Sequence, residues 1–488
     1  MPHRALPLEG FDLRRQVPWT QLFQSFRLAL RIRQLLLAAI GVTLTTVGWR
    51  LMEPSSTTTT RKLDEQPFVF TPTSWPWERD LGFDLTSPDP QDAGEPPVNA
   101  LWALASGLKN PQRFFSQVFG NWSVTLTPVT ELLNPGQRMF EPTVPASERL
   151  RALFQLLWWL VVWGLFGGAL SRSAAVEFAR DQSTHLTGAL RFAGRNYLSF
   201  LVGPLLTLLA VLGVALLLAL GGLFSRLPAI GTVVGGFGGG LALVIGLLLA
   251  ILVMGLAVGW PLMFATISVE GTDGFDGMSR AFNYVYERPL LYLWQIVLSL
   301  VYGSFAVFCV LFLGQLATLL SLQGLSLGAN RAWVESIADE APALLAPPLE
   351  NTDWALEADH DAPQSTQSDA TRADATGSDA TGSDATRSEA GSGVGDTIFK
   401  YWLRAWATLI HGFVYSFFWC SATLIYFVLR KSVDGNDLDE VFMGIQPEPD
   451  DLLPLVGAAA MGVDLTTSDR PANLSPLPPD NPPYAAPR

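Results

Sequence analysis

The chain is poor in cysteine, histidine and charge. Two of its 488 residues are cysteine and four are histidine, which excludes a disulfide framework and a Cys/His zinc site. Charged residues make up 15% of the chain, whereas an ordinary soluble domain carries about 25%. The sequence also lacks a Ser/His/Asp order, a metal-spaced histidine cluster and a phosphate-binding loop. It therefore predicts no catalytic residue, no cofactor-binding residue and no metal ligand, and we expect a protein that is not an enzyme.

What the chain does have is long apolar stretches without charge, separated by polar stretches. Hydrophobic residues make up 49%, and the mean hydropathy is +0.28. An apolar run of about 20 residues crosses a bilayer as a helix, and lipid offers the backbone no hydrogen-bond partner outside a helix or a closed barrel. Because the runs are continuous rather than alternating, helices are favoured. The fold class predicted is all-α, a polytopic transmembrane helical bundle of about six spans with amphipathic interfacial helices and disordered acidic segments.

The predicted organisation has seven segments. They are a cytoplasmic N-terminus with a basic amphipathic helix (1–34), a first span (35–52), an exoplasmic Trp/Phe/Pro-rich loop with short interfacial helices (53–148), a four-span core with two cytoplasmic interfacial helices (149–322), an exoplasmic acidic low-complexity linker (323–397), a last span (398–431) and a cytoplasmic acidic, Pro-rich tail (432–488). Lys and Arg gather beside the span ends on one side, which predicts that both termini are cytoplasmic. Two glycine pairs, Gly164/Gly168 and Gly236/Gly240, have the spacing that favours close helix packing in lipid.

Acidic charge is concentrated in two of these segments. Residues 323–397 carry 14 acidic and 3 basic side chains, and residues 432–488 carry 10 and 2. The first segment includes tandem pentapeptides of the type Ser-Asp-Ala-Thr-Gly between residues 368 and 387. Such repeats bury too little apolar surface to offset the entropy of ordering, so both segments are predicted to be disordered. The rest of the chain is mildly basic without a basic face interleaved with aromatics, so no nucleic-acid partner is expected.

The connection between the fourth and fifth spans, residues 270–289, is the most distinctive. It holds a candidate interaction surface made of Glu270, Asp273, Phe275, Asp276, Arg280 and Phe282. Thr272 or Asp273 is placed to cap a helix, and Asp276 and Arg280 have the i,i+4 spacing of a helical ion pair. The three carboxylates admit two interpretations, a cation or substrate site, or caps and solvated faces. A single surface helix rarely brings carboxylates together around a metal, which favours the second.

Polar side chains inside the apolar runs form a second group of candidates. They are Gln295, Gln315 and His411, and polar groups at such positions are costly in a bilayer. His411 lies near the outer end of the last span and is expected to be an interfacial or packing residue. An ion-coupled transporter usually holds a carboxylate or an arginine at mid-depth, and the sequence predicts none in the second to sixth spans.

Several stretches together resemble a group of uncharacterised polytopic membrane proteins of the planctomycete type. The matching stretches are residues 26–49, 163–182, 189–206, 259–289 and 429–442, of which 259–289 is the most specific. The chain is more distantly similar to the membrane domain appended to glycerophosphodiester phosphodiesterases, but it has no phosphodiesterase barrel. The resemblance implies a helical membrane fold and a location in the bacterial inner membrane, and it implies no activity.

Three hypotheses for function remain open. The leading one is a non-catalytic membrane scaffold or interaction protein, with the lipid bilayer and either a protein partner or a second copy of the chain as its contacts. The second is a transporter or permease component, which requires a polar cavity near Gln295, Gln315 or the acidic connection. The third is a lipid-modifying membrane enzyme, which requires Glu270, Asp273 and Asp276 to converge on one metal.

Overall fold

The computed structural model describes residues 18–53, 74–79, 115, 118–120, 122–141, 144–224, 231–329, 333–334, 337 and 394–443. Within these ranges every regular element is a helix, and six helices are long and apolar enough to cross a membrane. The prediction of an all-α, polytopic helical bundle is confirmed. The chain forms two compact units, Met1–Val441 and Phe442–Arg488, and the helices described below lie in the first.

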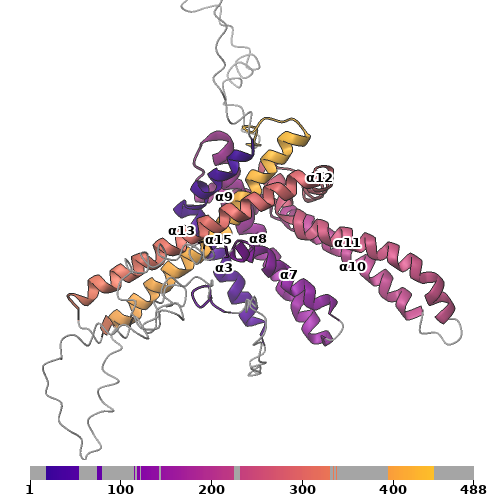
Figure 1. Ribbon diagram of the computed structural model, residues 1–488, viewed down its shortest axis with the longest axis horizontal. Helices are drawn as coiled ribbons and strands as arrows, with labels where there is room; N and C mark the ends of the chain where they lie inside the picture. Colours follow the sequence, from indigo (N-terminus) through magenta and orange to yellow (C-terminus); the bar gives the residue numbers. More distant parts are fainter. Residues whose placement is uncertain are drawn as a thin grey trace, which may run out of the picture. The chain divides into compact units, whose positions relative to one another are not determined.

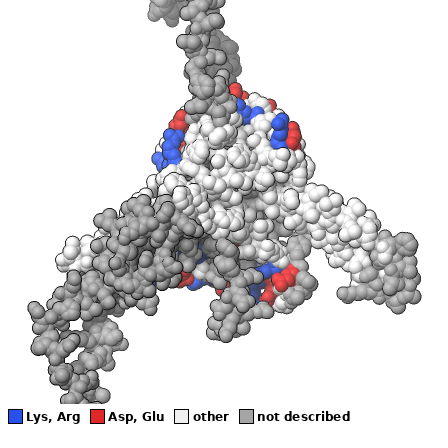
Figure 2. All heavy atoms as spheres, viewed as in Figure 1, with Lys and Arg blue, Asp and Glu red and all other residues white. Residues whose placement is uncertain are grey.

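The six membrane-spanning helices alternate in direction. They are α3 (Ile32–Leu51), α8 (Ala146–Arg180), α10 (Tyr197–Phe224), α11 (Gly231–Glu270), α13 (Pro289–Ser326) and α15 (Val394–Val433). We call the end of the bundle where α11 finishes the Glu270 end, and the opposite end the Arg79 end. Helices α10 and α11 run side by side as a hairpin, as do α13 and α15 (Figure 1). Charged side chains gather at two levels of the visible face, with uncharged side chains between them (Figure 2).

Short helices lie at the Glu270 end, where two of them join consecutive spans and two precede α3. They are η1 (Pro18–Phe23), α2 (Gln24–Ala29), α9 (Leu186–Arg195) and α12 (Gly274–Glu287). The predicted cap is confirmed, since the Asp273 carboxylate accepts a hydrogen bond of 2.8 Å from the Asp276 backbone N–H. Pro289 then starts α13, because its fixed φ suits the first helical position and its missing N–H costs nothing there.

The core is built around α15 and a cluster of four tryptophans. In the most apolar 18-residue stretch of α15, 94% of the residues are buried. Trp159 and Trp163 of α8, Trp260 of α11 and Trp419 of α15 contact one another, with ring centroids 5.2 to 6.1 Å apart. Two of these contacts are edge-to-face, the arrangement that aromatic quadrupoles favour. The most apolar window of α11, in contrast, is only 6% buried, as expected of a helix whose sides face lipid.

One of the two predicted glycine contacts forms. A Cβ at Gly168 would lie 2.7 Å from the Phe200 ring, and one at Gly164 would lie 3.1 Å from Leu201, so α8 and α10 approach closely there. At Gly236 and at Gly240, a Cβ would have no neighbouring heavy atom of the described residues within 4 Å. The spacing alone did not distinguish a packed glycine pair from an exposed one.

Part of the long loop lies inside the bundle. Helices α6 (Trp122–Thr125) and α7 (Thr127–Phe140) belong to the segment expected at the membrane interface. Ser304 Oγ donates a 2.6 Å hydrogen bond to the Val118 carbonyl, and a Cβ at Gly303 would lie 3.0 Å from Thr125. Gly303 lies 14 residues into α13, about 21 Å along the helix. Residues 122–129 therefore pack into the bundle against α13, and we call them the re-entrant segment.

Both predicted acidic segments begin later than expected. Helix α13 continues to Ser326, and α15 begins at Val394, so the two ends of the linker 323–397 are helical. Residues 434–441 pack back on the end of α15, where the Arg430 side chain donates to the carbonyls of Asp437 and Glu440. The pentapeptide tract and the tail beyond residue 443 lie outside the described residues.

Candidate functional site

Glu270 is the centre of a polar cluster that joins three helices. Its carboxylate accepts a 2.5 Å hydrogen bond from the Tyr426 hydroxyl of α15 and forms an ion pair with Arg280 of α12. Arg430 of α15 lies 3.8 Å from the same carboxylate. Arg280 Nε also donates to both Asp276 oxygens, at 3.2 and 3.1 Å, which confirms the predicted i,i+4 pair. We call Glu270, Asp276, Arg280, Tyr426 and Arg430 the Glu270 cluster.

The neighbouring carboxylates stabilise the protonated guanidinium of Arg280. Partial burial alone would lower the pKa of Arg280, but the charges of Glu270 and Asp276 outweigh it and raise that pKa. The Arg280 guanidinium therefore lies between the carboxylates of Glu270 and Asp276. Asp273 is exposed and caps α12. Among the described residues no group of three His, Cys, Asp or Glu side chains comes together that could hold a metal.

The two phenylalanines of the candidate surface differ in their surroundings. Phe275 is 62% exposed, as expected of an interaction surface. The ring of Phe282 covers Gly255 of α11 so closely that a Cβ there would lie 2.2 Å from it. Tyr286, one turn further along α12, donates a 2.7 Å hydrogen bond to the Ile251 carbonyl. Phe282 is thus mainly part of the contact between α11 and α12.

A buried ionic network lies toward the Arg79 end. Arg79 Nη1 lies 2.8 Å from Glu131 Oε1, 3.3 Å from His411 Nε2 and 3.4 Å from the Tyr415 hydroxyl. Arg79 Nη2 donates to Thr46 Oγ1 at 3.2 Å. The Arg79 and Glu131 side chains are 1% and 3% exposed. We call Thr46, Arg79, Glu131, His411 and Tyr415 the Arg79 network.

The sequence did not indicate this network. His411, expected to be an interfacial or packing residue, is fully buried and contacts a charged pair. Burial alone would lower the pKa of Arg79, but the neighbouring Glu131 and Tyr415 outweigh it and raise that pKa. Arg79 and Glu131 come from the long loop, so the apolar spans gave no indication of them.

The remaining polar candidates, Gln295 and Gln315, are buried, and neither lines the described pocket. Gln295 is fully buried, and its two amide atoms have no hydrogen-bond partner among the described residues. Gln315 is also buried. Two charged side chains that were not among the candidates lie in the last turns of α8. Arg172 donates a 2.8 Å hydrogen bond to the Ser268 carbonyl, and Glu177 forms a 2.5 Å ion pair with Arg31.

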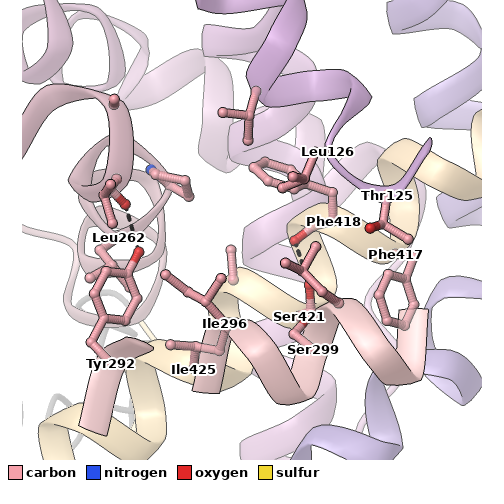
Figure 3. Close-up of a pocket in the computed structure, with 16 residues that line it drawn as sticks. Thr125, Leu126, Leu262, Tyr292, Ile296, Ser299, Phe417, Phe418, Ser421 and Ile425 are labelled. Carbon is pink, nitrogen blue, oxygen red and sulfur yellow. Dashed lines mark hydrogen bonds between the residues drawn. The ribbon is translucent and has the colours of Figure 1, made fainter. Parts of the chain in front are cut away.

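An apolar pocket of about 170 Å³ lies between α11 and α13 (Figure 3). Helix α15 forms its inner wall, and the re-entrant segment closes it toward the Arg79 end. Its lining comprises Thr125, Leu126, Val129, Ala257, Val258, Pro261, Leu262, Tyr292, Ile296, Ser299, Leu300, Phe417, Phe418, Ser421, Ala422 and Ile425. Neither Gln295, Gln315 nor a charged residue lines this pocket.

The described site therefore has three parts. They are the Glu270 cluster, which joins three helices, the buried Arg79 network and an apolar pocket.

Comparison of the chain with protein-family models, with curated proteins and with solved structures found no match.

Proposed function

We propose that the chain is a non-catalytic membrane scaffold whose Glu270 end holds α12 as a rigid docking element for a protein partner. The observation that carries this proposal is that α12 is fixed on three sides while Phe275 stays exposed. The Glu270 cluster joins α12 to α11 and α15, and Tyr284 of α12 donates a hydrogen bond to Asp434 beyond α15. A Cβ at Gly274 would lie 2.5 Å from the Ser199 carbonyl oxygen of α10.

Rigidity matters here because a preordered surface loses little entropy when a partner binds. Exposed aromatic side chains that do not have to be ordered on binding are frequent binding anchors. Asp273, Ser279 and Asn283 are exposed along the same helix and supply polar groups at the rim. This combination suits a protein surface better than bulk lipid.

The other two hypotheses find less support in the geometry. The pocket is apolar and lacks Gln295 and Gln315, so it does not provide the polar cavity that a permease for polar solutes requires. Arg280 lies between Glu270 and Asp276, where a metal-dependent lipid-modifying enzyme would need the metal. We propose further that the Glu270 end faces the cytoplasm of a bacterial inner membrane, because Arg27 of α2, Arg33 at the start of α3 and the arginines of α9 lie there.

Site-specific photo-crosslinking tests the docking proposal. A photoreactive phenylalanine analogue at position 275 should form a discrete protein adduct in native membranes, because this side chain is exposed. The same analogue at position 282 should crosslink within the chain, since that ring covers Gly255. Position 327, where Leu327 is 91% exposed at the other end of α13, is the matched control for exposure. Adducts only with lipid at position 275, or the same protein adduct at positions 275 and 327, would overturn the proposal.

Accessibility labelling tests the orientation. Ser147 and Ser183 are both exposed and lie at opposite ends of the same span, Ser147 in the first turn of α8 and Ser183 three residues after its last residue. In intact spheroplasts, a membrane-impermeant maleimide should label the Ser147→Cys variant and leave the Ser183→Cys variant unlabelled until the membrane is opened. The native thiols, Cys309 and Cys420, lie within spans and provide the background measurement. Labelling in the reverse order would contradict a cytoplasmic Glu270 end.

A further inference from the structure

The pocket between α11 and α13 lies inside the membrane-crossing part of the bundle. On α13 its lining runs from Tyr292 to Leu300, about 5 to 17 Å from the start of the helix at Pro289. On α11 it runs from Ala257 to Leu262, about 12 to 20 Å before Glu270. What reaches this pocket from outside the protein is therefore the hydrocarbon of the leaflet at the Glu270 end.

Three of the four hydroxyl groups that line the pocket donate to backbone carbonyls, and the fourth belongs to Ser299. Tyr292 donates a 2.6 Å hydrogen bond to the Val258 carbonyl, Thr125 donates to the Trp122 carbonyl at 2.6 Å, and Ser421 donates to the Phe418 carbonyl at 3.0 Å. A buried water needs about two to four polar partners, and this lining offers mainly methyl groups and rings. An apolar cavity of about 150 Å³ is already large enough to hold a molecule the size of benzene. The pocket thus suits a segment of hydrocarbon.

The pocket is closed on one side, as a pocket for the end of an acyl chain must be. Thr125, Leu126 and Val129 close it toward the Arg79 end, so the pocket does not continue across the bundle. Figure 3 shows Tyr292 on one side, Ile296 and Ile425 beside it, and Thr125, Leu126 and Phe417 on the far side. The sides of α11 and α13 near the opening carry exposed apolar residues, including Met254 and Val297. A lipid tail can enter laterally between these two helices.

A basic residue lies where the head group of such a lipid would be. Arg288 is exposed and immediately precedes α13. It lies four residues before Tyr292, whose backbone N–H donates a 3.0 Å hydrogen bond to the Arg288 carbonyl, and so about 6 Å before it along the axis. A guanidinium binds phosphate through paired hydrogen bonds. The phosphate would meet Arg288 while the tail extends past Tyr292 toward Thr125.

From these observations we infer that the pocket binds one acyl chain of a bilayer phospholipid from the Glu270-end leaflet, with the phosphate at Arg288. This inference goes beyond the proposed scaffold and is independent of any protein partner. The occupant is a resident lipid with a defined position, in contrast to lipid that exchanges freely around the spans.

The test uses the full chain in proteoliposomes with a phosphatidylglycerol that carries a diazirine at the end of one acyl chain. After irradiation, peptide mass spectrometry locates the label. We expect label on residues 417–425 of α15 and on residues 125–129, because only a tail inside the pocket reaches them. Residues 417–425 are almost entirely buried, so bulk lipid cannot label them. Label confined to the exposed sides of α11 and α13 would overturn the inference.

Two phenylalanine substitutions on α13 form a matched pair. Ser299→Phe fills the pocket, whereas Val301→Phe enlarges a side chain that is 50% exposed on the outer side of the same helix. A phenylalanine ring in the pocket leaves no room for the tail, so labelling of residues 417–425 should fall several-fold. Val301→Phe should leave it unchanged, and equal labelling in the two variants would contradict the inference. If Ser299→Phe is not monodisperse in detergent, Ala257→Phe fills the same pocket from α11.

The position of the phosphate at Arg288 is tested separately, by comparing a phospholipid with a lipid that has no phosphate. Arg288→Gln should lower pocket labelling by the diazirine phosphatidylglycerol several-fold, because a charge-assisted pair with phosphate is lost. Labelling by a diacylglycerol with the same diazirine chain should not change, since that lipid has no phosphate. Equal effects on the two lipids would place the phosphate elsewhere.

Discussion

Replacing Glu131 by leucine should lower the free energy of unfolding by about 3–5 kcal/mol, because it leaves the buried charge of Arg79 without its partner. Arg79→Leu should be destabilising for the same reason, since it removes the cation that pairs with the buried Glu131 carboxylate. The two side chains are 1% and 3% exposed, so water cannot replace the lost contact. The measurement is the apparent melting temperature of the purified protein in mild detergent, followed by intrinsic tryptophan fluorescence.

The double variant separates the ion pair from simple loss of packing. Arg79→Leu/Glu131→Leu removes both charges, so its destabilisation should be smaller than the sum of the two single effects by about 1.5 kcal/mol or more. The matched control is the pair of Arg50 and Glu78, whose side chains are 37% and 49% exposed. Its removal should cost less than about 1 kcal/mol. Additive effects at Arg79 and Glu131 would show that the pair is not coupled.

Gly167→Leu should be the most damaging substitution in the aromatic core. A Cβ at Gly167 would lie 2.4 Å from the Trp419 ring, and Trp419 is itself fully buried between Trp163, Trp260 and Phe264. The ring has no space to move into, so α8 and α15 must separate. Overpacking of a rigid core costs about 3 kcal/mol. We expect a large fall in the apparent melting temperature and loss of the native tryptophan emission.

The control for this prediction is Gly213→Leu in α10. Nothing described lies within 4 Å of a Cβ at Gly213, and the position is inside a helix. Leucine has a higher helix propensity than glycine, so this variant should keep or slightly raise the melting temperature. A fall of similar size in the two variants would mean that the cost comes from the leucine itself rather than from the contact with Trp419.

The spans could be predicted from the sequence because hydropathy is a local property. All six were found, although several ends were displaced. Helix α15 begins at Val394 rather than at 398, since Asp396, Lys400 and Arg404 interrupt the apolar run without breaking the helix. The pair of Asp276 and Arg280 was also predictable, because i,i+4 spacing is fixed by helix geometry.

The Arg79 network could not be predicted in the same way. Arg79 and Glu131 are 52 positions apart, and Arg79 and His411 are 332 apart. No local pattern links residues so distant, and the loop that holds the first two was assigned to the membrane surface. The one available indication was chemical, since His411 is a polar residue in an apolar run and needs a partner. The pocket was unpredictable for a related reason, as residues of five helices line it.

The central position of α15 has a consequence for how the protein is made. Translation adds about 5–20 residues per second, so the 332 positions between Arg79 and His411 take roughly 15 seconds to a minute. During that interval the ribosome has delivered Arg79 and Glu131, but their histidine and tyrosine partners do not yet exist. The core around α15 cannot be completed before the last helix is made, and a chain that stalls before Val394 would present an uncovered charged pair and an incomplete tryptophan cluster to the proteases of the membrane.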